Sequence, residues 1–117
     1  MGLTVDNAQK RRTTLLPLIA ERRSEIAALC RRFGVRRLDV FGSAARGDFD
    51  PARSDIDFLV EFATEEDNFA RFVDFKEALE VLLARRVDLV DRKGIEASRN
   101  YIRKRHILTG AEPVYAA

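Results

Sequence analysis

The chain of 117 residues has the length of one ordinary domain, and its hydrophobic and charged fractions, 46% and 34%, are typical of a folded protein and exclude a disordered one. The net charge of +2 is too small to indicate a nucleic-acid partner by itself. No apolar run reaches the ~20 residues of a membrane helix, and the single cysteine, Cys30, excludes an intrachain disulfide and fits a reducing cytoplasm, where we expect the protein.

The first part of the chain predicts a helix and then a strand. Residues 1–12 are polar, and we expect them to be weakly ordered, so that a single domain covers residues 13–117. Apolar residues at helical spacing predict a helix that Thr14 can cap and Gly34 can end. The segment VRRLDVFG, residues 35–42, follows as the first strand.

The middle of the chain predicts a second strand, a helix and a third strand. The second strand is SDIDFLVEF, residues 54–62, in which alternate side chains should face opposite sides of the sheet. Thr64 then opens a helix, and acidic residues in its first turn suit the helix dipole. The third strand is RVDLVD, residues 86–91. The apolar stripe of the helix comprises Phe69, Phe72, Val73, Leu79, Leu82 and Leu83.

The end of the chain predicts one more helix, from about Ile95 to His106, and an irregular or extended tail. We expect His106 to complement the helix dipole rather than to take part in catalysis. Strands that alternate with helices predict one α/β domain. Its sheet should be small and mixed, with three or four strands flanked by helices, because a long helix joins the second and third strands as a crossover requires.

Three aspartates in this order suggest a metal site. Asp55 and Asp57 share one face of the second strand, about 6.5–7 Å apart along the chain, and Asp88 lies on the third strand. Mg²⁺ prefers oxygen ligands and takes one or two protein carboxylates together with substrate phosphates. A cluster of three carboxylates suits phosphoryl chemistry with two metal ions. Each aspartate alone is a weak signal, because a solvated strand end explains it as well.

A glycine–serine turn between the first two strands is suited to phosphate. Gly42 allows the backbone to approach a ligand closely, and Ser43 and the residues after it can present backbone N–H groups at the start of a helix. Arg46 and Arg53 are close in sequence and carry the side chain best shaped for phosphate. Turn and aspartates together predict a site for a nucleotide and its metal ions.

The segment FGSAARGDFDPARSDIDFLVEF resembles the signature of the DNA polymerase beta-type nucleotidyltransferases, and specifically of the minimal nucleotidyltransferase (MNT) group. That pattern is Gly-Ser, a spacer of about ten residues, Asp-x-Asp and a later Asp, and the resemblance covers roughly residues 14 to 115. The spacer here, residues 44–54, is one residue longer than usual. The extra residue can displace Arg53, so Arg46 is the better candidate for the nucleotide. The matching residues are Gly42, Ser43, Asp55, Asp57 and Asp88.

The resemblance implies an enzyme that transfers AMP from ATP, with two Mg²⁺ ions. Asp55 and Asp57 would bind both ions, and Asp88 would complete the second metal site and help to activate the attacking hydroxyl. Pyrophosphate would leave. The residues that would bind the nucleotide are Gly42, Ser43, Arg46, Asp55 and Asp57.

The resemblance also implies a partner. A chain of this length has no room for the domains that hold the acceptor in larger members, so we expect another protein to supply it. Minimal members resemble the antitoxins of toxin–antitoxin pairs whose toxin is a HEPN-domain RNase, and active ones transfer AMP to a tyrosine near the RNase site of the toxin. We therefore expect an antitoxin that adenylylates its HEPN toxin within a hetero-oligomer.

Two alternatives to this function stay open. The protein can neutralise a toxin by binding alone, or it can transfer a nucleotide to RNA or to a small molecule. The chain lacks the interleaved aromatic and basic residues expected of a protein that binds single-stranded RNA, which argues against direct nucleic-acid binding.

Overall fold

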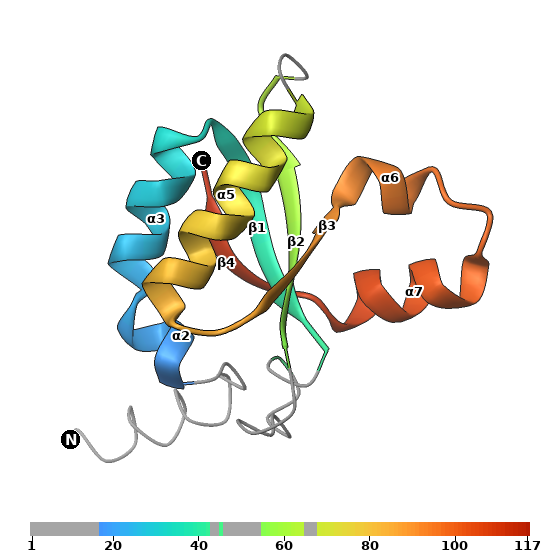
Figure 1. Ribbon diagram of the computed structural model, residues 1–117. Coiled ribbons are helices and arrows are strands. Elements are labelled where there is room, and N and C mark those ends of the chain that lie inside the picture. The colour runs from blue at the N-terminus through green and yellow to red at the C-terminus, as the bar shows by residue number, and fades with distance from the viewer. Residues whose placement is uncertain (1–16, 43–44, 46–54, 65–67) are drawn as a thin grey trace.

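The computed structural model describes residues 17–42, 45, 55–64 and 68–117 (Figure 1). Outside the described residues lie the predicted N-terminal segment 1–12, the predicted cap Thr14 and the candidate phosphate-binding residues Ser43, Arg46 and Arg53. Within the described ranges, none of the helices is both long and apolar enough to cross a membrane.

Four strands form one mixed sheet in the order β3-β2-β1-β4. The central strands β1 (Val35–Phe41) and β2 (Ile56–Phe62) pair antiparallel. β3 (Val87–Asp91) runs parallel to β2, and β4 (Glu112–Ala116) runs antiparallel to β1. The predicted α/β fold with a small mixed sheet is confirmed. The predicted tail is the edge strand β4, where Pro113 is tolerated because an edge strand does not need every N–H group.

Three helices cover one face of the sheet, coloured blue and yellow in Figure 1: α2 (Pro17–Glu21), α3 (Arg23–Arg32) and α5 (Asn68–Leu83). The single helix predicted before Gly34 is interrupted at Arg22, whose backbone N–H donates to carbonyls three and four residues earlier. Gly34 follows α3 with a φ of +69°, as expected of a glycine that ends a helix.

The main core lies between these helices and the sheet face that carries Phe58 and Val60. Cys30 is fully buried there, and burial raises the pKa of its thiol to about 12. The prediction that Phe69 joins this core is wrong, because its side chain is 82% exposed. It lies in the first turn of α5, whose buried residues begin only at Phe75.

The other face of the sheet carries α6 (Arg92–Glu96) and α7 (Tyr101–Gly110), which are orange in Figure 1. The prediction of one continuous helix from 95 to 106 is therefore wrong. The helix breaks because the side chain of Asn100 accepts a hydrogen bond from Arg103 N at 3.1 Å, which caps a new helix at that point. The smaller core under α6 and α7 is formed by Leu59, Ile95 and Ile107.

Glu80, near the end of α5, fixes the position at which β3 starts. Its Oε2 accepts hydrogen bonds from Val87 N at 3.0 Å and from Lys76 Nζ at 3.2 Å. The hydrogen bond from Val87 is the main reason that the pKa of Glu80 lies below its ordinary value of 4.5; partial burial opposes this shift and Lys76 adds to it. An ionised Glu80 therefore holds the strand that carries Asp88.

Replacing Glu80 by Gln should make folding stability less sensitive to acid. Since the pKa of Glu80 is lowered by folding, its ionised form stabilises the fold above pH 4.5, and this contribution is lost as the pH falls through the folded pKa. Glutamine still offers Val87 an acceptor but does not titrate. Denaturant unfolding should show an advantage of the wild type over Glu80→Gln at neutral pH that shrinks at about pH 3.

The matched control is Glu77→Gln, an exposed glutamate of the same helix, for which the difference from the wild type should be small at both pH values. A difference between the wild type and Glu80→Gln that stays the same at both pH values would contradict this role of Glu80.

Candidate functional site

Asp57 and Asp88 lie side by side on one face of the sheet. The two residues are register partners on the parallel strands β2 and β3. Neighbouring strands are about 4.8 Å apart and paired residues point to the same face. Asp57 is half-buried and Asp88 is exposed, so the pair opens to solvent. Two carboxylates so arranged offer the oxygen ligands that a hard divalent cation prefers.

Asp55 does not join this pair. It precedes β2 rather than lying within it, and its Oδ1 is 3.5 Å from Nε of Arg86. Arg86 supplies an opposite charge, whereas the neighbouring carboxylates would repel Asp55. Within the part of the chain that is described, no three His, Cys, Asp or Glu side chains come together as metal ligands. The expected convergence of three aspartates is therefore not seen among the described residues. Asp55 pairs with Arg86 instead, a contact that was not predicted from the sequence.

Gly42 lies directly against the carboxylate of Asp57. It has a φ of +72°, and a Cβ atom at this position would overlap Oδ2 of Asp57. Its carbonyl accepts a hydrogen bond from Ala45 N at 3.1 Å, so the chain turns tightly after β1. Glycine is needed here for two independent reasons, since both the backbone angle and the contact exclude a side chain. The turn predicted to hold phosphate and the aspartate predicted to hold metal thus adjoin.

Asp39, on the same face of β1, is fully buried between two arginines. Its Oδ1 lies 3.2 Å from Nε of Arg37, and its Oδ2 accepts from Arg92, the first residue of α6. The side chain of Arg92 is only 10% exposed, and among the described residues its Nε has no hydrogen-bond partner. A buried charge is tolerated only beside an opposite charge, so this pair fixes α6 to β1. The role of Arg92 was not predicted from the sequence.

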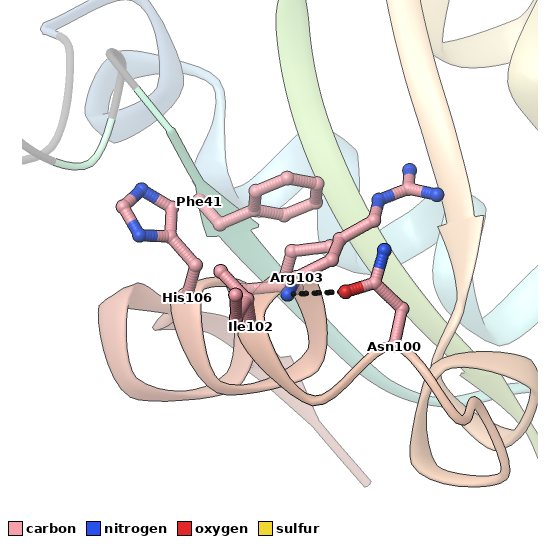
Figure 2. Close-up of a pocket in the computed structure, with 6 residues that line it drawn as sticks. Phe41, Asn100, Ile102, Arg103 and His106 are labelled. Atoms are coloured by element: carbon pink, nitrogen blue, oxygen red, sulfur yellow. Dashed lines mark hydrogen bonds between the residues drawn. The ribbon is translucent and has the colours of Figure 1, made fainter.

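An open hollow of about 490 Å³ lies beside the aspartates, between β1 and α7 (Figure 2). This hollow was not predicted from the sequence. His106 was expected only to complement the helix dipole. The residues on this side of α7 recur at a spacing of four, Ile102 with His106 and Arg103 with Ile107, which is the one signal of a shared face. The residues that line the hollow are Phe41, Asn100, Ile102, Arg103, His106 and Ile107.

Removing Arg92 should destabilise the fold strongly. In Arg92→Met, Asp39 stays buried with only the half-exposed Arg37 as its partner, and we expect a loss of about 3 kcal/mol in the free energy of unfolding. Denaturant unfolding measures this loss. Arg37→Met should cost less than about 1 kcal/mol, because the side chain of that arginine is 46% exposed and solvent screens its charge.

The double variant Asp39→Leu/Arg92→Met removes both buried charges and should recover most of the stability lost in Arg92→Met. Equal stability of Arg92→Met and the wild type would show that the pair does not hold α6.

Replacing Gly42 by Ala should also destabilise the chain. The positive φ and the overlap with Asp57 together should cost about 1–3 kcal/mol, which lowers the Tm by roughly 5 °C or more. Thermal unfolding measures the change. Gly110→Ala is the control, since nothing lies within 4 Å of a Cβ atom at that position. A Tm in Gly42→Ala no lower than in Gly110→Ala would contradict the close contact.

Comparison with known proteins connects this geometry to a family. Residues 24–108 match the nucleotidyltransferase domain family. Over 66 residues the chain is 44% identical to the protein adenylyltransferase MntA of Thermococcus cleftensis, a match that covers 56% of this chain and 65% of that protein, just under two thirds of its length. Over 76 residues it is 37% identical to a proposed protein adenylyltransferase of Methanocaldococcus jannaschii, covering 62% of this chain and 71% of the relative.

Two solved structures of known proteins have a fold similar to that of this chain. A proposed minimal nucleotidyltransferase is 36% identical, with a TM-score of 0.69 over 85% of this chain and 95% of the other. An MNT antitoxin in complex with a tri-AMPylated HEPN toxin of Shewanella oneidensis is similar in fold alone, at 21% identity and a TM-score of 0.57 over 85% of this chain and 73% of the other. The expected resemblance is confirmed, and the chain belongs to a family of enzymes, the nucleotidyltransferase domain family.

Proposed function

We propose that this protein is a Mg²⁺-dependent nucleotidyltransferase that moves AMP from ATP to a hydroxyl group of a partner protein. The observation that carries the proposal is the register of Asp57 and Asp88, next to a glycine turn whose backbone touches Asp57. Family membership supports the reaction class, and the relative from Thermococcus cleftensis, named as a protein adenylyltransferase, supports protein as the acceptor.

The donor set fits magnesium. Asp57 and Asp88 offer oxygen ligands from neighbouring strands, and Mg²⁺ takes one or two carboxylates together with phosphate oxygens. Because Gly42 has no Cβ atom, the backbone of the turn can lie against Oδ2 of Asp57. Asp55 would serve as a further ligand after it leaves Arg86, whose side chain is 84% exposed and whose ion pair is therefore weak.

The chain's own residues would orient the reactants. When bound, Mg²⁺ would neutralise charge on the triphosphate and make the α-phosphorus more electrophilic. The turn at Gly42 would hold the outer phosphates, with Ser43 and Arg46 adding a hydroxyl and a positive charge. The acceptor oxygen would form a bond to the α-phosphorus, the bond from that phosphorus to the bridging oxygen would break, and pyrophosphate would leave. Asp88, which is exposed, would take the proton of the acceptor hydroxyl.

We further propose that the acceptor is a tyrosine of a cognate HEPN toxin and that the transfer makes this chain an antitoxin. Solved structures with the same fold include a toxin–antitoxin complex with AMP-PNP, at 24% identity and a TM-score of 0.61 over 81% of this chain and 73% of the other. They also include the complex with a tri-AMPylated HEPN toxin described above. A macromolecular acceptor suits a carboxylate pair that opens to solvent.

Label transfer tests the proposed function. With Mg²⁺, α-labelled ATP and an extract of its host, the chain should label a HEPN protein, and Asp57→Asn should lower the rate at least about a hundredfold because a carboxylate at the reacting phosphate is lost. The control Asp74→Asn, an exposed aspartate of α5, should transfer label at the wild-type rate.

Other results of the labelling experiment would indicate a different site, mechanism or acceptor. Undiminished labelling by Asp57→Asn would refute the assigned site. No label on any molecule, with the partner still co-purifying, would favour an antitoxin that acts by binding alone. Label on RNA or on a small molecule would change the acceptor class and leave the reaction in place.

A further inference from the structure

The segment that contains α7 is strongly basic. Residues 97–111 include four of the 21 lysines and arginines of the chain and none of its 19 aspartates and glutamates, so this segment has a charge of +4 and the rest of the chain a charge of −2. Among the described residues, no ion pair joins these four side chains to a carboxylate. The four residues are Arg99, Arg103, Lys104 and Arg105.

Tyr101 is the tyrosine that this basic segment presents to solvent. It is the first residue of α7, directly after the cap Asn100, and its side chain is 75% exposed. In Figure 1 this end of α7 lies at an outer corner of the molecule, away from β4. The other tyrosine of the chain, Tyr115, is partly buried against the main core. Of the two, Tyr101 is therefore the one that can enter a site on another molecule.

Helical geometry places Tyr101 on the outer face of α7, away from the aspartates of its own chain. The inner face of α7 lines the hollow against β1, and three of its residues are labelled in Figure 2: Ile102, Arg103 and His106. An α-helix turns about 100° per residue, so Tyr101 lies roughly opposite to the middle of this set. Its neighbours on the outer face are Lys104 and Arg105, three and four residues later. Nζ of Lys104 lies 6.0 Å from the centre of the Tyr101 ring.

The outer face of α7 and the proposed site carry opposite charges. At the site, the carboxylates of Asp57 and Asp88 and a bound triphosphate together carry more negative charge than Mg²⁺ neutralises. Surfaces of opposite charge attract one another and favour one orientation of approach. Because Asp88 is exposed, α7 of a second copy of the chain can approach the site from solvent.

We propose that Tyr101 is itself an acceptor, and that one copy of the chain transfers AMP from ATP to Tyr101 of a second copy. This inference rests on the proposed function. The phenolic oxygen of Tyr101 would form a bond to the α-phosphorus while the bond from that phosphorus to the bridging oxygen breaks and pyrophosphate leaves. The phenolic proton would pass to Asp88 of the copy that holds the ATP. Lys104 and Arg105 would then lie beside the negatively charged phosphodiester and stabilise it.

Labelling of the purified full-length chain tests this acceptor. The chain is incubated with Mg²⁺ and α-labelled ATP without any other protein, and mass spectrometry locates the added AMP. We expect AMP on the peptide that contains Tyr101, and less than about a tenth of the wild-type label in Tyr101→Phe, which lacks the attacking hydroxyl. The matched control Tyr115→Phe should take up as much label as the wild type. Undiminished labelling of Tyr101→Phe would overturn the inference.

A mixing experiment tests transfer between copies. Asp57→Asn keeps the acceptor but lacks a carboxylate of the site, whereas Tyr101→Phe keeps the site but lacks the acceptor. Neither variant alone should become labelled, and in a mixture the label should appear on the Asp57→Asn chain, which an affinity tag identifies. The initial rate per wild-type chain should also rise in proportion to the protein concentration. A labelled wild type whose rate per chain does not depend on concentration, with no label in the mixture, would overturn transfer between copies.

The two proposals fail in different ways. If Tyr101→Phe labels a HEPN protein in the host extract while the purified wild type carries no AMP on Tyr101, this inference is overturned and the proposed function stands. If neither the purified chain nor any molecule of the extract becomes labelled, the proposed function and the inference are overturned together.

Discussion

The buried charge of Asp39 constrains the whole aspartate-bearing face of the sheet. A carboxylate without solvent on a central strand requires an opposite charge, and Arg92 supplies it from a position 53 residues later in the chain. Because Arg92 is the first residue of α6, the chain that leaves β3 must cross back over the sheet toward β1. This pair holds α6 on the sheet, and the packing of Ile95 and Ile107 on Leu59 holds α6 and α7 there as well.

The passage of the chain back over the sheet through α6 and α7 divides one sheet face into two environments. Under α6 and α7, Leu59 of β2 is buried with Ile95 and Ile107. Asp57 lies two residues earlier on the same strand and is not part of that cluster. It lies next to Asp88 on the neighbouring strand and contacts Gly42. The alternation of a β-strand forces Leu59 and Asp57 onto the same face, so the polar site and the apolar support beside it come from a single stretch of sequence.

Sequence alone could predict what depends on local period and spacing. Alternation placed Asp57 on the face opposite Phe58, and the position of Gly42 after a strand indicated a close approach. It could not choose Arg92 among 21 lysines and arginines, because that choice depends on how α6 crosses the sheet. Nor could it foresee that Arg86 pairs with Asp55, since the two meet only where β2 and β3 begin together. The break before α7 depends on the cap at Asn100, which the helical spacing of apolar residues does not reveal.

The sheet order also bears on the kind of acceptor that the proposed reaction would use. Asp88 lies on β3, an edge strand of the described sheet, whereas the open hollow on the Phe41 side of Asp57 is flanked by α7. On the proposed function, the side flanked by α7 is the one where the chain's own residues can contact a small ligand. Asp88 is exposed at this edge, so an acceptor there would be positioned by its own contacts. A hydroxyl presented by a bound protein satisfies that requirement, whereas a freely diffusing small acceptor would have little to hold it.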